Sequence, residues 1–161
     1  MKLLIKITGI ALLLMSQLAF AQEYKNHAVE RLLTAKEAPS GVVFEIITWE
    51  KDAWDWAAPM LKQFRHQLLE KYPDLDIALV SHGGEQFELT KDKVKKNAVV
   101  FDALQSLSDQ GVSLHVCGTH SSWRNVEESE YVDFINVSPS APAQMNDYMT
   151  LGFIHILLQA P

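Results

Sequence analysis

The sequence predicts an α/β fold in which a mostly parallel sheet of about five strands carries helices on both faces. β-rich runs alternate with stretches whose apolar residues recur every three or four positions, and short loops join them. Strands that alternate with helices in this way are typical of a parallel sheet. The composition, 48% hydrophobic and 21% charged over 161 residues, provides for one domain with a substantial core and excludes a disordered chain.

The first 21 residues are typical of a secretory signal peptide. Lys2 and Lys6 precede an apolar stretch over 7–20, and Ala19-Phe20-Ala21 fits the small-x-small cleavage pattern. An uncleaved membrane anchor is the alternative, but the apolar stretch is short for a span of ~20 residues. Cleavage after Ala21 predicts a periplasmic or secreted protein that is free of the membrane. Cleavage would remove two lysines and no acidic residue, so the net charge would change from −6 to −8, which argues against nucleic acid as a partner.

The predicted elements follow the cleavage site in order. Residues 22–40 form a polar arm with one weak helical stretch at 28–35, and residues 41–161 form the α/β domain. Strands are expected at 42–49, 75–81, 112–117, 132–137 and 153–158. Helices are expected at 54–69 with Asp52 as N-cap, at 100–107, at 121–131 and at 144–151, and a polar connection at 85–96.

Three sequence features fall where predicted strands end. Trp49 to Trp56 follows the first strand, His82-Gly83-Gly84 follows the second, and Cys117-Gly118-Thr119-His120 ends the third. Ligands of open parallel sheets bind at the carboxyl ends of the strands, so we expect these segments to form one site. Three tryptophans flank these strand ends and line either a pocket or a subunit interface, namely Trp49, Trp56 and Trp123.

Cys117 is the only cysteine of the chain. An exported protein with one thiol cannot form an internal disulfide, so the thiol is either a buried, inert side chain or a reactive nucleophile. A strand end that faces a helix N-terminus favours the second alternative, because backbone amides stabilise a thiolate there. We expect the amides near Gly118 and Thr119 to do so.

Two further interpretations concern the histidines near these strand ends. His82 with Gly83 and Gly84 is either a tight turn with a surface histidine or a loop whose backbone approaches a ligand closely. His115, Cys117 and His120 together offer ligands that suit copper or zinc, although three ligands within six residues form a loose pattern. Ordinary strand and loop histidines are the alternative. No cofactor is predicted.

An ordered set of motifs resembles the DsrE/DsrF-like proteins, which include the YchN-like group. The set begins with Val80-Ser81-His82-Gly83-Gly84, continues through a helix that ends near Gly111, and reaches Leu114-His115-Val116-Cys117-Gly118-Thr119. A Val-Ser-Pro-Ser segment at 137–140 and Gly152 before an aromatic strand complete it. The likeness spans about residues 42–158.

The resemblance implies a three-layer α/β/α fold that assembles into homotrimers or homohexamers. It also implies sulfur handling, in which the thiol at Cys117 carries a persulfide and passes its sulfane sulfur to an acceptor protein. His82 or His120 would orient or deprotonate the thiol. Two features depart from the relay members of that family: this chain carries an export signal, and Thr119-His120-Ser121-Ser122-Trp123 replaces their small-polar and aliphatic stretch. A non-catalytic oligomer that binds a ligand or metal at the same cleft is the alternative function.

Overall fold

The structure, a computed structural model, describes residues 23–161 and confirms the predicted three-layer α/β/α fold. Five parallel strands form one sheet in the order β4-β3-β2-β1-β5. The strands are β1 (Gly41–Ile46), β2 (Asp76–Ser81), β3 (Ser113–Cys117), β4 (Asn136–Ser138) and β5 (Phe153–Leu157). The predicted signal peptide lies outside the described residues.

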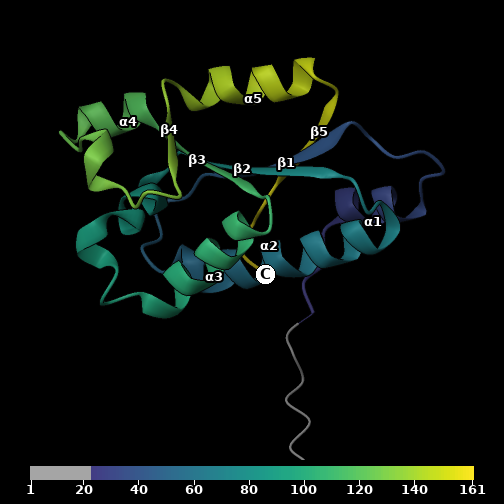
Figure 1. Ribbon diagram of the computed structural model, residues 1–161, viewed down its shortest axis with the longest axis horizontal. Coiled ribbons are helices and arrows are strands. Elements are labelled where there is room, and N and C mark those ends of the chain that lie inside the picture. Colours follow the sequence, from purple (N-terminus) through teal and green to yellow (C-terminus); the bar gives the residue numbers. More distant parts are fainter. Residues whose placement is uncertain (1–22) are drawn as a thin grey trace, which may run out of the picture.

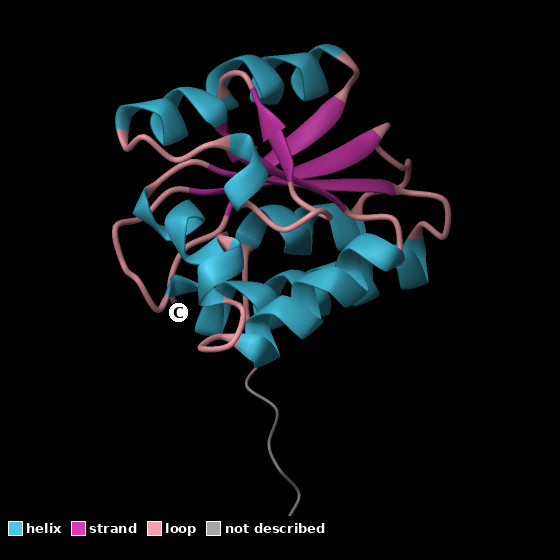
Figure 2. Cartoon of the chain, turned by 60° about the vertical axis from the view of Figure 1, so that its left-hand side comes forward, coloured by secondary structure: helices cyan, strands magenta, loops and turns pink. Residues whose placement is uncertain are grey.

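Helices cover both faces of the sheet, as Figure 1 shows. On one face lie α1 (His27–Thr34), α2 (Ala53–Lys71) and α3 (Ala98–Asp109), and on the other lie α4 (Gly118–Trp123) and α5 (Ala141–Thr150). Figure 2 shows the same layers from the side, with the sheet between them. No helix among residues 23–161 is long and apolar enough to cross a membrane.

The core follows from the apolar pattern of the elements. Strand β1 reads Gly-Val-Val-Phe-Glu-Ile and is buried on both faces, as is typical of a central parallel strand. Along α2, Ala57, Leu61, Phe64 and Leu68 recur at helical spacing and are almost completely buried. The larger core lies on the α2 and α3 side of the sheet, and a smaller cluster that includes Val43, Cys117 and Met145 lies under α5.

The strand register brings three chain segments to one edge of the sheet. Ile46 of β1 pairs with Ser81 of β2, and Ser81 pairs with Val116 of β3. The next residue of each segment, Ile47, His82 or Cys117, therefore emerges at the same level. Because the strands are parallel, this level is the carboxyl edge of the sheet, where the ligand site was expected.

Two predicted elements were wrong in extent. The helix expected at 121–131 is α4, which begins at Gly118 because the Cys117 side chain caps it, and the chain turns away at Asn125 with a φ of 53°. The strand expected at 132–137 is β4 at Asn136–Ser138, because a turn from Ile135 N–H to the Val132 carbonyl precedes it.

The polar connection expected at 85–96 is largely structured. It contains the 3-10 helices η1 (Gly84–Leu89) and η2 (Lys91–Lys93). Its polar side chains Glu85 and Gln86 are completely buried, which a reading of residue polarity alone would not predict. Both residues bear on the site described next.

Candidate functional site

Cys117 lines a cavity at the carboxyl edge of the sheet. The cavity has a volume of about 330 Å³ and lies at the ends of β1, β2 and β3 and the starts of α4 and α5. Cys117 itself is 5% exposed. The residues that line the cavity are Ile47, Trp49, His82, Cys117, Thr119, His120, Trp123, Ser140 and Pro142. The structure therefore brings the sequence-predicted residues Cys117, His82 and His120 together around one cavity.

Two backbone amides donate hydrogen bonds to the sulfur of Cys117. The N–H of His120 and the N–H of Ala141 each lie 3.4 Å from Sγ. His120 belongs to the first turn of α4 and Ala141 is the first residue of α5, so the sulfur faces the start of two helices. N–H groups and helix dipoles at such positions favour negative charge, and a thiolate accepts these bonds better than a neutral thiol does.

The amide of His120 adjoins Gly118 and Thr119, near which donors were expected, whereas the amide of Ala141 comes from a segment that the sequence analysis did not name. The N–H of Thr119 donates instead to the carbonyl of Pro139 at 3.1 Å, and its hydroxyl donates to the same carbonyl at 2.8 Å. Gly118 packs closely against β4, where an added Cβ would lie 2.9 Å from the Ser138 carbonyl oxygen. Gly118 and Thr119 thus tie α4 to the segment before α5, which brings Ala141 to the sulfur.

Gln86 holds the backbone of Cys117 from beneath. Its side-chain carbonyl accepts the N–H of Cys117 at 2.9 Å, and its amide nitrogen lies 3.3 Å from the carbonyl of Cys117 and 3.3 Å from Ser121 Oγ. Ser121 also donates to the Cys117 carbonyl at 2.9 Å and shares a hydrogen bond with the Tyr131 hydroxyl. Burial raises the pKa of Tyr131, so this hydroxyl stays protonated at neutral pH. The sulfur therefore projects from a rigid backbone.

His120 is held by one hydrogen bond and three aromatic rings. Its Nδ1 lies 3.0 Å from the carbonyl oxygen of His82, which can only accept, so Nδ1 carries the hydrogen. The rings of Trp49, Phe87 and Trp123 surround the imidazole at centroid distances of 5.5, 4.9 and 5.8 Å. Arg124 lies over the rings of Trp49 and Phe87, which adds cation–π contacts to this wall.

Large apolar side chains at the cavity mouth are open to solvent. Ile47, Trp49 and Trp123 are 52%, 68% and 75% exposed. Trp49 and Trp123 line this pocket, which was one of the two expectations for the tryptophans, the other being a subunit interface. Trp56 does not line this cavity, and its indole nitrogen is buried without a hydrogen-bond partner among the described residues.

Gly83 is required by the loop and does not line the cavity. A Cβ at Gly83 would lie 2.2 Å from Glu85 Oε2 and 2.4 Å from the Thr48 carbonyl oxygen, so only glycine fits. The carboxylate of Glu85 accepts hydrogen bonds from Ser81 Oγ, Gly83 N and Thr48 N, at 2.8, 2.9 and 2.9 Å. Gly84 packs near Trp49 outside the cavity. The loops after β1 and β2 are therefore locked together by a buried carboxylate that the sequence analysis did not identify.

The proposed metal ligand His115 is engaged elsewhere. Its Nε2 lies 2.8 Å from the Tyr148 hydroxyl of α5 and its Nδ1 lies 3.1 Å from Ser138 Oγ. Burial lowers the pKa of His115, which keeps the ring neutral. Within residues 23–161, no group of three or more histidine, cysteine or acidic side chains is arranged to hold a metal ion.

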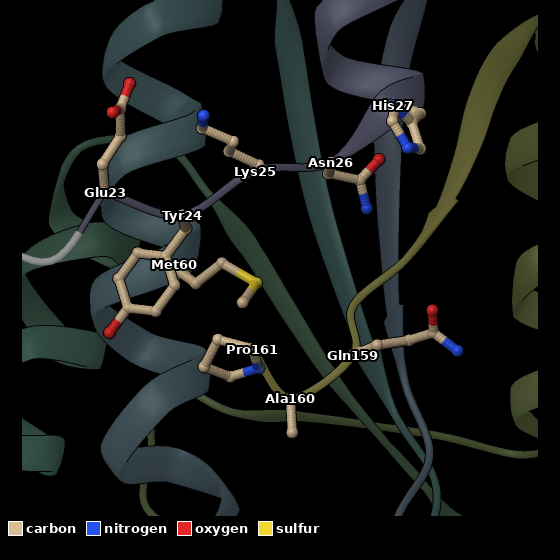
Figure 3. Close-up of a pocket in the computed structure, with 9 residues that line it drawn as sticks. All are labelled: Glu23, Tyr24, Lys25, Asn26, His27, Met60, Gln159, Ala160 and Pro161. Atoms are coloured by element: carbon tan, nitrogen blue, oxygen red, sulfur yellow. The ribbon is translucent and has the colours of Figure 1, made fainter.

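A second cavity, of about 510 Å³, lies between the first described residues and the C-terminal segment (Figure 3). Tyr24 and Met60 lie on one side of it and Gln159 to Pro161 on the other. It lies apart from the only thiol of the chain, so the smaller cavity at Cys117 is the candidate site for nucleophilic chemistry.

Comparisons with known proteins establish the fold and no family. No family model matches the chain, and no curated protein matches it. A solved structure, the protein of unknown function MTH1491 from Methanobacterium thermoautotrophicum, is similar with a TM-score of 0.59 and 17% sequence identity. The match covers 73% of this chain and 97% of that one. At this level of identity, the likeness concerns the arrangement of strands and helices alone.

Proposed function

We propose that this protein carries sulfane sulfur as a persulfide on Cys117 and passes it to an acceptor. The observation that supports this most directly is the set of groups that surround the sulfur atom of Cys117. Cys117 Sγ accepts two backbone N–H groups at the wall of an apolar cavity that His82 and His120 also line. The motifs shared with DsrE/DsrF-like proteins point to the same chemistry.

In such a carrier, the sulfur of Cys117 is a thiolate before it is loaded and again after it is unloaded. In the loading step, the Cys117 thiolate attacks the outer sulfur of a persulfide donor. A bond forms between Sγ and that sulfur, the donor's sulfur–sulfur bond breaks, and the donor leaves as a thiolate. In the unloading step, an acceptor thiolate takes the outer sulfur and Cys117 leaves as a thiolate. Neither step requires an oxidant, and amide donors stabilise the anion at each stage.

The depth of the site also suits this role. A persulfide is reactive toward other thiols, and Cys117 is only 5% exposed, so the cavity wall restricts access to it. The volume of about 330 Å³ admits a small sulfur donor or the end of a partner's side chain. The exposed Trp49, Trp123 and Ile47 at the mouth are suited to contact that partner.

We further propose that the carrier works in the periplasm or outside the cell as a homotrimer or homohexamer, with a separate protein as sulfur donor or acceptor. The signal-peptide pattern supports export, and the resemblance supports the assembly. Exposed apolar side chains such as Ile154 and Leu151 on the β5 side provide surface for subunit contacts.

Sulfur loading tests the proposal directly, because every thiol signal comes from one residue. The purified protein is incubated with glutathione persulfide and its intact mass is measured. We expect a gain of one sulfur atom, reversed by excess dithiothreitol, and no gain in Cys117→Ser. A wild-type protein that gains no sulfur from either persulfide or polysulfide donors would overturn the proposal.

A second candidate is a module that binds an apolar ligand without turnover. The apolar lining of the cavity and the exposed indoles at its mouth favour it. Cys117→Ser separates the two functions. A carrier loses all sulfur transfer in this variant, whereas a simple binder retains its ligand affinity, measured by quenching of tryptophan fluorescence.

A further inference from the structure

The carboxylate of Glu45 lies between two histidines beside the cavity. Its Oε1 is 2.6 Å from Nε2 of His82, and its Oε2 is 2.7 Å from Nε2 of His155. Glu45 comes from β1, His82 follows β2, and His155 comes from the edge strand β5. The side chains of Glu45 and His82 are 18% and 16% exposed, and that of His155 is 36% exposed. Both bonds are short, as expected of hydrogen bonds to an ionised carboxylate.

These bonds assign the hydrogens of the His82 ring. An ionised carboxylate only accepts, so Nε2 of His82 carries a hydrogen and a neutral ring has its lone pair on Nδ1. Among residues 23–161, no group forms a hydrogen bond with His82 Nδ1. His82 lines the cavity that also holds Cys117, so one residue of that cavity carries a ring nitrogen free to accept a proton.

We propose that Glu45 is a positioning residue that prepares His82 to accept the proton of the Cys117 thiol, an inference that rests on the proposed function. The proton leaves Sγ for Nδ1 of His82, which yields a thiolate and an imidazolium. The Glu45 carboxylate accepts the hydrogen of Nε2, keeps the ring in the required tautomer and faces its positive charge, as the third member of a nucleophile–base–carboxylate set does. His155 binds the second carboxylate oxygen and so keeps Oε1 directed at His82.

The charged groups around His82 favour this exchange. Glu45 faces its ring from β1, and His155 lies beyond that carboxylate on β5. From η1, Glu85 accepts the N–H of Gly83, the next residue along the chain. From α4, the ring of His120 donates to the carbonyl of His82, and Cys117 of β3 lines the same cavity. Of these groups, the Glu45 carboxylate is the one bonded to the imidazole, so it is the counter-charge for the proton that His82 accepts.

The test compares the alkylation of Cys117 by iodoacetamide in three variants over a range of pH. We expect Glu45→Gln to slow alkylation near neutral pH by about tenfold, the scale on which carboxylate partners of functional histidines act, and to change the pH profile. Glu45→Asp retains a carboxylate and should restore most of the rate. Glu30→Gln is the matched control, because it removes the exposed pair between Glu30 and His27, 3.2 Å apart on α1, and should match wild type.

A spectroscopic measurement distinguishes positioning from a loss of packing. Nitrogen chemical shifts of His82 should show the hydrogen on Nε2 in wild type and a changed tautomer in Glu45→Gln. A neutral His82 ring in wild type with its hydrogen on Nδ1 and none on Nε2 would overturn the inference, as would an unchanged alkylation profile in Glu45→Gln. If Glu45→Gln does not fold, His155→Asn on the partly exposed edge strand carries the test. A smaller slowing is expected there, and no slowing would overturn the inference.

The two proposals fail separately. If wild type loads sulfur but its alkylation does not depend on Glu45, the positioning role is wrong and the carrier function stands. If wild type loads no sulfur but Glu45→Gln still slows alkylation, the positioning role stands as part of another thiol chemistry.

Discussion

The buried carboxylate of Glu85 provides the sharpest test of how the site is built. Glu85 is completely buried and accepts three hydrogen bonds, from Ser81 Oγ, Gly83 N and Thr48 N. Oε1 takes two of these donors and Oε2 takes the third. In Glu85→Gln, the amide carbonyl can replace Oε1, but an NH₂ group then faces the N–H of Thr48. One bond to a charged acceptor is lost and one N–H is left without a partner.

The expected loss of stability follows from these two terms. A hydrogen bond to a charged group contributes about 1.5–3 kcal/mol, and an unsatisfied buried N–H costs about 1–3 kcal/mol. A neutral amide is easier to bury than a carboxylate, which offsets part of the loss. We expect the free energy of unfolding to fall by about 2 kcal/mol.

Urea denaturation measures this difference, with an unchanged m value as the sign that the unfolding transition is comparable. Glu37→Gln, an exposed carboxylate far from the site, serves as control and should stay within about 0.5 kcal/mol of wild type. A loss for Glu85→Gln no larger than that of the control would refute the argument that Glu85 locks the loops after β1 and β2.

Three further predictions concern the same region. Gly83→Ala should prevent correct folding, because its Cβ would lie 2.4 Å from the Thr48 carbonyl oxygen; circular dichroism and thermal melting report this, and a wild-type melting temperature would contradict it. Gln86→Leu should lower the free energy of unfolding by about 1–3 kcal/mol, because the Cys117 N–H loses its acceptor, and urea unfolding measures it. Burial lowers the pKa of His115 below its ordinary 6.5, so the unfolded chain binds the proton more tightly. Stability should therefore decrease as the pH falls below about 6.5, and His115→Asn should reduce that dependence in urea unfolding on either side of this pH.

Much of the fold was predictable because the signals are local. The apolar run of β1 and the three- and four-residue spacing of α2 depend only on neighbouring residues. The boundaries of α4 and β4 were not predictable in this way. They depend on the side chain of Cys117 as a helix cap and on a turn that precedes Asn136, both of which arise from tertiary context.

The candidate site also contains residues that the sequence could predict and residues that it could not. Cys117, His82 and His120 could be placed together because parallel strands end at one edge. The amide of Ala141 and the side chain of Gln86 could not be assigned to the site from the sequence, because nothing in their local sequence distinguishes them. Glu45 and His155 did leave a signal, since each is a lone ionisable residue in an otherwise apolar strand. Such a residue on a strand is worth treating as a candidate for the site.

The convergence on one sulfur atom argues for a function beyond packing. A small buried side chain needs no hydrogen-bond donors, yet Cys117 Sγ receives two, from the beginnings of α4 and α5. Buried polar side chains fix its backbone from below, and two histidines with assigned tautomers share its cavity. Each arrangement uses polar groups that are costly to bury when unsatisfied. Replacing Cys117 by alanine would leave the amides of His120 and Ala141 without an acceptor. A side chain that served only to pack the core would not require these two donors, so their presence favours a chemical role for the thiol.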